Sequence, residues 1–208
     1  MARKTKAEAE QTRTLILDTA EKLFHEQGVS HTSLADIAQA AGLTRGAIYW
    51  HFQDKLDLFN AMHERIAMPF SETLEKLATL EDPLGALRIR CIEDLENLVD
   101  DEHLCRVLSV ILHKCEYVAE MGQLCERFDS HVCKVMEAKE KVMYHAHQLG
   151  QLRRGLDPHL AAVALHNFML GTISDWLFAP ERHCSLRRDA RVLVDIFFRG
   201  IAAAPLPD

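Results

Sequence analysis

The chain has 208 residues, of which 48% are hydrophobic and 26% are charged, values that are ordinary for a soluble globular protein. This composition argues against a disordered chain. No apolar run reaches the roughly 18 residues that a membrane span requires, so we expect no membrane partner. The charged start is not followed by an apolar stretch and does not resemble a signal peptide, which predicts a cytoplasmic protein.

The formal net charge of −7 is unevenly distributed along the chain. Residues 1–60 hold seven Lys and Arg against eight Asp and Glu, a net charge of −1, and the remaining −6 lies in residues 61–208. The basic residues of the first part concentrate at its start and around positions 45–55. A local basic area on an acidic protein is compatible with DNA binding.

Nearly every segment has a helical pattern, and strand-like alternation is absent. Apolar residues from Ile16 to Phe24 form a helical stripe that stops at Gly28. Pro69 is expected to kink the long helix in which it lies, and Asp-Pro pairs open two later helices. After the first helix, the pattern predicts helices over residues 34–41, 44–51, 55–80, 82–100, 102–115, 119–149, 158–179 and 186–203.

The two short segments at 34–41 and 44–51 have the features of a helix-turn-helix. Thr32 or Ser33 can cap the first helix, with Asp36 completing a capping box on Ser33. Gly42 supplies the positive φ that a tight turn between crossed helices requires. Thr44 then caps the second helix. Ile37, Ile48 and Phe52 are expected to face the core.

The second short helix presents a face suited to the major groove. Arg45 can reach guanine edges or phosphate, and Gly46 lets the backbone come close to DNA. Tyr49, His51, Thr44 and Lys55 are suited to phosphate oxygens, as are backbone N–H groups near Thr32 and Ser33. The alternative is a surface hairpin with an incidental arginine. The Ala-x-x-x-Gly spacing and the exposed Tyr-Trp-His run disfavour it.

Residues 13–59 closely resemble the N-terminal domain of TetR-family regulators. The run Gly42-Leu43-Thr44-Arg45-Gly46-Ala47-Ile48-Tyr49-Trp50-His51-Phe52, followed by Lys55, matches the signature of that family. With the opening Arg3-Lys4-Thr5-Lys6, it looks most like the AcrR-like branch, whose members repress multidrug efflux pumps. The resemblance implies an all-α fold, a two-fold dimer, a palindromic operator and a small-molecule inducer. It also implies a DNA-contact set of Thr32, Ser33, Thr44, Arg45, Gly46, Tyr49, Trp50, His51 and Lys55.

We therefore predict an all-α protein of about nine helices, with a DNA-binding domain at 1–54 and a ligand-binding and dimerisation domain at 55–208. Residues 160–178 and 192–201 are apolar over more than one stripe, which predicts a homodimer that forms through the last two helices. Inward positions of the central helices are typical of a site for a hydrophobic or amphipathic ligand. Any one of these residues is more often ordinary core. They are Ile66, Phe70, Cys91, Leu108, Leu112, Val132, Met136, His166, Met169 and Leu170.

The sequence contains no G-x-S-x-G elbow, phosphate-binding glycine loop or HExxH motif, so we expect neither an enzyme nor a cofactor. The pairs His113/Cys115 and His145/His147 lack the i, i+4 spacing of two ligands on one helix face, so no metal site is expected. The six cysteines are expected to be reduced thiols. A redox-responsive regulator that senses oxidants through cysteine, and a constitutive DNA-binding protein without an inducer, stay open beside the leading hypothesis. That hypothesis is a ligand-responsive repressor controlling a multidrug efflux pump.

Overall fold

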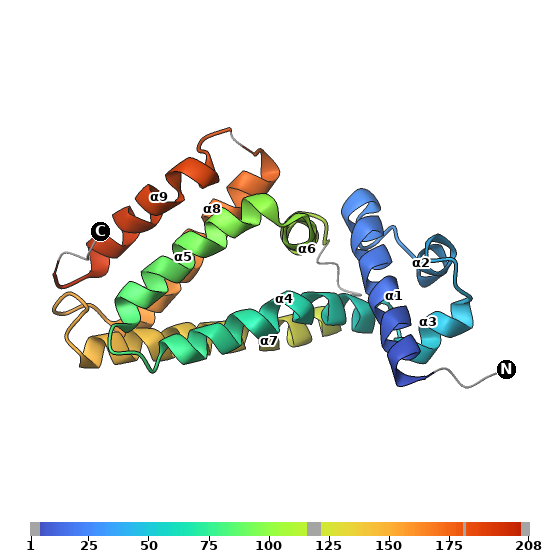
Figure 1. Ribbon diagram of the computed structural model, residues 1–208, viewed down its shortest axis with the longest axis horizontal. Helices are drawn as coiled ribbons and strands as arrows, with labels where there is room; N and C mark the ends of the chain where they lie inside the picture. The colour runs from blue at the N-terminus through green and yellow to red at the C-terminus, as the bar shows by residue number, and fades with distance from the viewer. Residues whose placement is uncertain (1–4, 116–121, 181, 205–208) are drawn as a thin grey trace. The chain divides into compact units, whose positions relative to one another are not determined.

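The computed structural model describes residues 5–115, 122–180 and 182–204, and in the helix that begins at Gly122 it describes side chains from Cys133 onwards. This part of the chain holds nine α-helices and one isolated β-bridge, between Leu152 and Ala202, which confirms the predicted all-α fold (Figure 1). The helices are α1 Lys6–Gln27, α2 Leu34–Ala40, α3 Arg45–His51, α4 Lys55–Leu77, α5 Pro83–Asp100, α6 Glu102–His113, α7 Gly122–Gln148, α8 Pro158–Phe178 and α9 Leu186–Ile201. Over the described residues, no helix is long and apolar enough to cross a membrane.

Local caps fix where these helices begin and end. α1 begins well before its apolar stripe, because Thr5 and Glu8 form a capping box at its start. It ends at Gly28, whose φ of +86° suits the glycine that the sequence places there. The predicted Asp-Pro starts are also present, with Asp82 accepting a hydrogen bond at the start of α5 and Asp157 at the start of α8. The first residues of the predicted 119–149 helix lie outside the described part.

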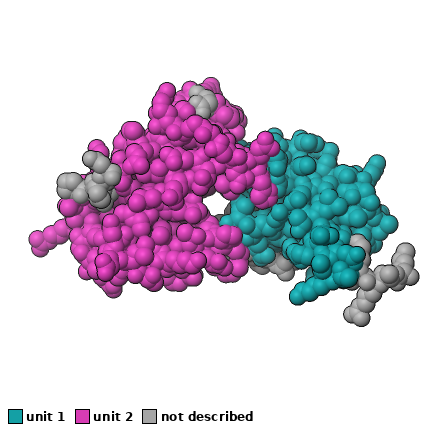
Figure 2. All heavy atoms as spheres, viewed as in Figure 1, with its two compact units in different colours: residues 1–66, 106–128 teal, residues 67–105, 129–208 magenta. Residues whose placement is uncertain are grey.

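The chain divides into two compact units, shown in different colours in Figure 2. Unit 1 comprises residues 1–66 and 106–128, and unit 2 comprises residues 67–105 and 129–208. The chain therefore passes from unit 1 to unit 2 inside α4, between residues 66 and 67, and crosses between the units again at 105/106 and 128/129. The functional division at 54/55 stays a prediction.

Unit 1 joins α6 to the short N-terminal helices in one hydrophobic core. Phe24, Ile37 and Ile48 are fully buried there, together with Val107 and Val110 of α6. A charged contact adds to this packing, since Arg106 Nε donates to Glu21 Oε1 at 2.7 Å. The backbone N–H of Val29 also donates to the carbonyl of Lys114 at 3.1 Å. α6 is thus fixed against α1 by apolar, ionic and backbone contacts.

Unit 2 is organised by the packing of α5 and α8 against α9. Arg88 Nε on α5 donates to Asp195 Oδ1 on α9 at 2.6 Å, and both side chains are largely buried. The rings of Phe168 and Phe197 stack at 5.3 Å between α8 and α9. Val194 and other apolar residues of α9 are fully buried on the side facing the unit.

Candidate nucleic-acid interface

The start of α2 is set by the capping box that the sequence predicts. The backbone N–H of Asp36 donates to Ser33 Oγ at 3.2 Å, and that of Ser33 donates to Asp36 Oδ2 at 2.9 Å. The Ser33 hydroxyl also donates to Asp36 Oδ2 at 2.6 Å. This hydrogen bond, followed by the one from the Ser33 N–H, lowers the pKa of the Asp36 carboxyl. Ser33, and not Thr32, is therefore the cap.

The turn between α2 and α3 also forms as predicted. Gly42 has a φ of +66°, and the N–H of Leu43 donates back to the carbonyl of Ala38 at 2.9 Å. Thr44 caps α3, its hydroxyl oxygen accepting from the N–H of Ala47 at 3.2 Å. Ile48 is fully buried and holds α3 on the core of unit 1.

The opposite face of α3 is exposed and rich in large side chains. Trp50 exposes 72% of its surface and Tyr49 exposes 52%, and Arg45 and Gly46 are exposed beside them. His51 is half-buried, and its ring lies edge-on to that of Trp50 with 4.5 Å between centroids. Two exposed aromatic rings on a seven-residue helix are unusual for a free surface and are typical of a binding surface.

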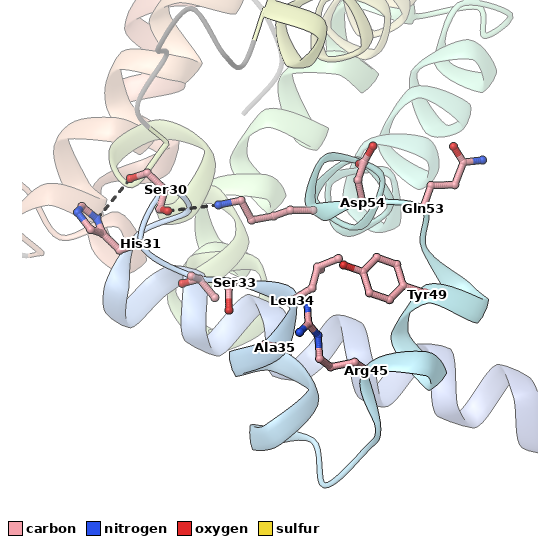
Figure 3. A pocket seen from close by; sticks show the side chains of 11 residues that line it. Ser30, His31, Ser33, Leu34, Ala35, Arg45, Tyr49, Gln53 and Asp54 are labelled. Carbon is pink, nitrogen blue, oxygen red and sulfur yellow. Dashed lines mark hydrogen bonds between the residues drawn. The ribbon is translucent and has the colours of Figure 1, made fainter.

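A hollow of about 480 Å³ lies between α2, α3 and the loops that flank them. Figure 3 shows Arg45 and Tyr49 pointing into it from α3. Arg45 and Lys55 supply two positive charges to its wall against the one negative charge of Asp54. The lining residues are Ser30, His31, Thr32, Ser33, Leu34, Ala35, Arg45, Tyr49, Gln53, Asp54 and Lys55.

Two of the predicted DNA contacts, Lys55 and Thr32, are already engaged inside unit 1. Lys55 Nζ donates to the carbonyls of Val29 at 2.7 Å and Ser30 at 3.3 Å, and burial lowers the pKa of its ammonium group. Thr32 is buried, and its hydroxyl donates to the carbonyl of Gly28 at 2.8 Å. Both side chains hold the loop between α1 and α2, which sequence reasoning missed because the partners are backbone carbonyls. Their contacts to DNA stay predictions.

The predicted ligand-pocket residues are divided between the two units. Ile66, Leu108 and Leu112 belong to unit 1, where Ile66 and Leu112 pack against its core. The side chain of Val132 lies outside the described part, and Leu170 is 39% exposed. These two residues and the remaining five are in unit 2. Of those five, Cys91 and Met169 are buried, and Phe70, Met136 and His166 are half-buried. Their role in ligand binding stays a prediction.

Phe70 and His166 are brought together by a residue that the sequence reasoning missed. Lys139 of α7 is only 5% exposed, and its Nζ lies 3.2 Å from His166 Nδ1 and 5.8 Å from the ring centroid of Phe70. A signal for its burial exists, because Lys139 precedes Val142, Met143 and Ala146 with the i, i+3, i+4, i+7 spacing of one helix face. All three of these residues are buried.

Among the described residues, Cys91, Cys105, Cys115, Cys133 and Cys184 form no disulfide. Cys91 is buried in unit 2, where desolvation raises the pKa of its thiol to about 12. Cys133 is exposed on α7. The side chain of Cys125 lies outside the described part.

The fold and the α2–turn–α3 geometry define a helix-turn-helix DNA-binding protein, and comparison with known proteins gives its family. Residues 16–62 match the family described as bacterial regulatory proteins, tetR family. Residues 82–202 match the C-terminal region of the MAATS-type transcriptional repressors. The chain belongs to the TetR family of bacterial transcriptional regulators.

Relatives match this chain over almost its whole length. The HTH-type transcriptional regulator AcrR of Shigella flexneri is 40% identical over 207 residues, which cover 99% of this chain and 96% of the relative. The crystal structure of NalD, the secondary repressor of the MexAB-OprM multidrug efflux pump in Pseudomonas aeruginosa, superposes with a TM-score of 0.86 at 40% identity, covering 95% of this chain and 98% of NalD. A complex of SmeT with triclosan gives a TM-score of 0.85 at 33% identity, covering 95% of this chain and 100% of SmeT. SmeT is the repressor of the Stenotrophomonas maltophilia multidrug efflux pump SmeDEF.

Proposed function

We propose that this protein is a ligand-responsive transcriptional repressor that binds a palindromic operator as a homodimer and is released by a small amphipathic inducer. The observation that carries the proposal is the exposed Arg45–Tyr49–Trp50 face of α3, supported from behind by the buried Ile48. Repression of a multidrug efflux pump is proposed from the relatives, since NalD and SmeT are repressors of such pumps. Because chromosomal DNA in a bacterium lies in the cytoplasm, we place the protein there.

Exposed apolar residues on the last two helices support the homodimer. Phe178 at the end of α8 exposes 72% of its surface, and Val192 and Ile196 on α9 expose 59% and 67%. Val192 and Ile196 are four residues apart and therefore lie on one face of the helix. Val194 and Phe198, on the opposite face, are fully buried. A helix with apolar residues on two faces requires a second partner, and another copy of α8 and α9 meets that need.

The placement of α6 offers a route from a ligand to the DNA-binding helices. α6 ends in unit 1, where Val107 and Val110 share a core with Ile37 and Ile48. The buried carboxylate of Glu21 is held by Arg106 at the start of that segment. A ligand that shifted α6 or α4 would therefore reposition α2 and α3 as a body, and the spacing of the two α3 helices in a dimer would cease to match the groove. Such a switch requires a differential affinity of several kcal/mol between the two conformations.

The experiment is selection of binding sites by the purified full-length protein from fragments of the promoter regions of its source genome. We expect recovery of one palindromic site upstream of a transporter operon, and its release by an amphipathic compound such as triclosan. The Arg45→Ala variant, selected in parallel, should retain the site more weakly and with a relaxed preference at one base pair of each half-site, which distinguishes specific selection from non-specific retention. Release by oxidant alone would assign the sensing role to the cysteines, and failure of the natural protein to select any site would contradict the proposal.

A further inference from the structure

The interior of unit 2 contains a cluster of charged side chains from three helices. Arg90 and Asp94 come from α5, Lys139 from α7 and His166 from α8. Arg90 Nη2 pairs with Asp94 Oδ1 at 2.7 Å, and the Lys139 ammonium lies 3.2 Å from His166 Nδ1. We propose that this cluster, with the ring of Phe70 beside it, recognises the anionic group of an aromatic ligand. The inference rests on the proposed function and names the class of inducer that it favours.

The charges of the cluster do not balance. Arg90 and Lys139 are two cations, Asp94 is the largely buried carboxylate that acts on both, and the neighbouring carboxylate of Glu93 is exposed to solvent. Burial lowers the pKa of the Lys139 ammonium, whereas the carboxylate of Asp94 and the thiol of Cys91 favour its charged form. Cys91 contributes no negative charge near neutral pH, because burial raises the pKa of its thiol to about 12. The pKa of His166 is lowered, first by burial and then by Lys139, so its ring is neutral near pH 7. Apart from the exposed Glu93, the cluster thus holds two cations against one carboxylate, in a partly buried site where an anion is attracted more strongly than at an open surface.

The hydrogen-bond donors of the cluster also outnumber its acceptors. Within the described residues, Lys139 Nζ makes one hydrogen bond, to His166 Nδ1, although an ammonium carries three N–H groups. Arg90 Nε is buried and has no hydrogen-bond partner among the described residues. A buried donor without an acceptor is destabilising, and a carboxylate or sulfonate would supply the missing acceptors. A cationic ligand would add further donors and a like charge.

Phe70 gives the cluster an aromatic element. The Arg90 guanidinium carbon lies 5.7 Å from the centroid of this ring, and Lys139 Nζ lies 5.8 Å from it. Both cations are therefore within the range of cation–π attraction to one ring, and this attraction helps to hold the two charged groups in place beside it. A ligand whose anion meets these two cations would bring its own apolar body next to Phe70, so an aromatic anion fits better than a small inorganic one.

The test uses two fluorescent probes that share one ring system and differ in charge. Anilinonaphthalene sulfonate is an anion, and phenyl-naphthylamine is the same skeleton without the sulfonate. Each is titrated into the full-length protein in the absence of DNA. We expect the anion to bind about tenfold more tightly than the neutral probe, the effect of one or two charge-assisted hydrogen bonds. This comparison needs no variant and so does not depend on whether a substituted protein folds.

The variant that tests the assignment is Lys139→Met, which keeps the length of the side chain and removes the charge. We expect it to weaken the anion about tenfold and to leave the neutral probe within about twofold. Lys141→Met is the matched control, because Lys141 lies on the same helix, is 58% exposed and pairs with Glu75. It should alter neither affinity.

Two results would overturn the inference: equal affinities of the natural protein for the two probes, or the same loss of both probes in Lys139→Met. Either result would show that the cluster stabilises unit 2 through its own contacts and does not recognise an anion. Operator release is measured separately and tests the proposed function alone. If the neutral probe releases the operator while both probes bind equally, the result supports the proposed repressor function and contradicts the anion site. Anion-selective binding without operator release would support the anion site and contradict its role as the inducer site.

Discussion

At the scale of the residue, α3 exposes large aromatic side chains that the stability of the fold does not require. Trp50 and Tyr49 are large aromatic residues on the outer face of α3, and neither is required to hold that helix, since Ile48 anchors it. Burying these rings against a partner would remove apolar surface from water. Arg45 extends from the same face with a guanidinium that matches the acceptor pair of guanine in the major groove.

Replacing Arg45 with alanine is expected to weaken operator binding by about 1–3 kcal/mol and to relax the preference at one base pair of each half-site. The reason is the loss of a bidentate contact to a base edge. Fluorescence anisotropy with the selected operator measures the effect. Arg154→Ala, an exposed arginine of unit 2, serves as the control and should bind normally. Unchanged affinity of the Arg45 variant would remove this residue from base recognition.

The ion pair between Arg88 and Asp195 predicts a pH dependence of stability. The hydrogen bond from Arg88 lowers the pKa of the Asp195 carboxyl below its ordinary value of 3.8. The stabilisation is therefore complete above that ordinary value and is lost as the pH falls through the lower folded-state pKa. Asp195→Asn should reduce the free energy of unfolding by about 2 kcal/mol at pH 7, and by progressively less as the pH falls below about 4.

Urea denaturation at one fixed protein concentration, repeated from neutral to acidic pH, measures this loss. Asp100→Asn is the control, because Asp100 pairs with Arg187 on the surface, where both side chains are more than half exposed. That substitution should change the stability by less than about 1 kcal/mol at any pH. A constant difference between the natural protein and Asp195→Asn across the acidic range would contradict the assignment.

At the scale of the element, the two glycines of the helix-turn-helix have different tasks. Gly42 lies in the turn with a φ of +66°, and an added Cβ would meet no atom within 4 Å, so only backbone strain opposes a substitution. Gly46 lies inside α3, where an added Cβ would meet Thr44 Oγ1 at an ordinary 3.9 Å. Strain disfavours alanine at Gly42, and helix propensity favours it at Gly46.

We therefore expect Gly42→Ala to reduce the free energy of unfolding by about 1–2 kcal/mol and Gly46→Ala to raise it by about 0.5–1 kcal/mol. Despite its added stability, Gly46→Ala should bind the operator more weakly, because the new methyl group lies on the face that approaches DNA. Urea denaturation and operator anisotropy on the same preparations separate the two effects. If both variants lost the same stability, the positive φ of Gly42 would not be the reason that this position requires glycine.

The elements that could be predicted from the sequence are those set by short-range interactions. Ser33 and Asp36 are three residues apart, and Gly42 and Thr44 determine the turn and the cap within one turn of helix, so the pattern predicts both short helices. The inclusion of α6 in unit 1 depends on Arg106 meeting Glu21, a contact far apart in the chain that no local pattern records. The unit 2 cluster was missed because, although the helical spacing places Lys139 on a buried face, no local pattern records that side chains of α5 and α8 meet it there.

At the scale of the whole molecule, selective recognition of an operator requires two copies of the chain. One α3 reads too few base pairs to select a site, and a dimer places two such helices about one helical turn of DNA apart, roughly 34–36 Å. Ile196→Glu, which puts a charge in the exposed apolar face of α9, should convert the dimer to a monomer in analytical ultracentrifugation. Ile89→Glu on α5, where the side chain is 52% exposed, is the control and should remain dimeric. A dimer in both variants would place the interface elsewhere.

We expect ligand and operator to bind to different conformations of this protein, which thermodynamic linkage makes measurable. The measurement is the affinity of a compound that releases the operator, determined for the free protein and for the protein saturated with its operator. Because coupling is reciprocal, an inducer that weakens operator binding must itself bind the operator complex more weakly by the same factor. We predict at least about a hundredfold weaker binding to the operator complex, equivalent to roughly 3 kcal/mol. Equal affinity for the free and the operator-bound protein would contradict the account.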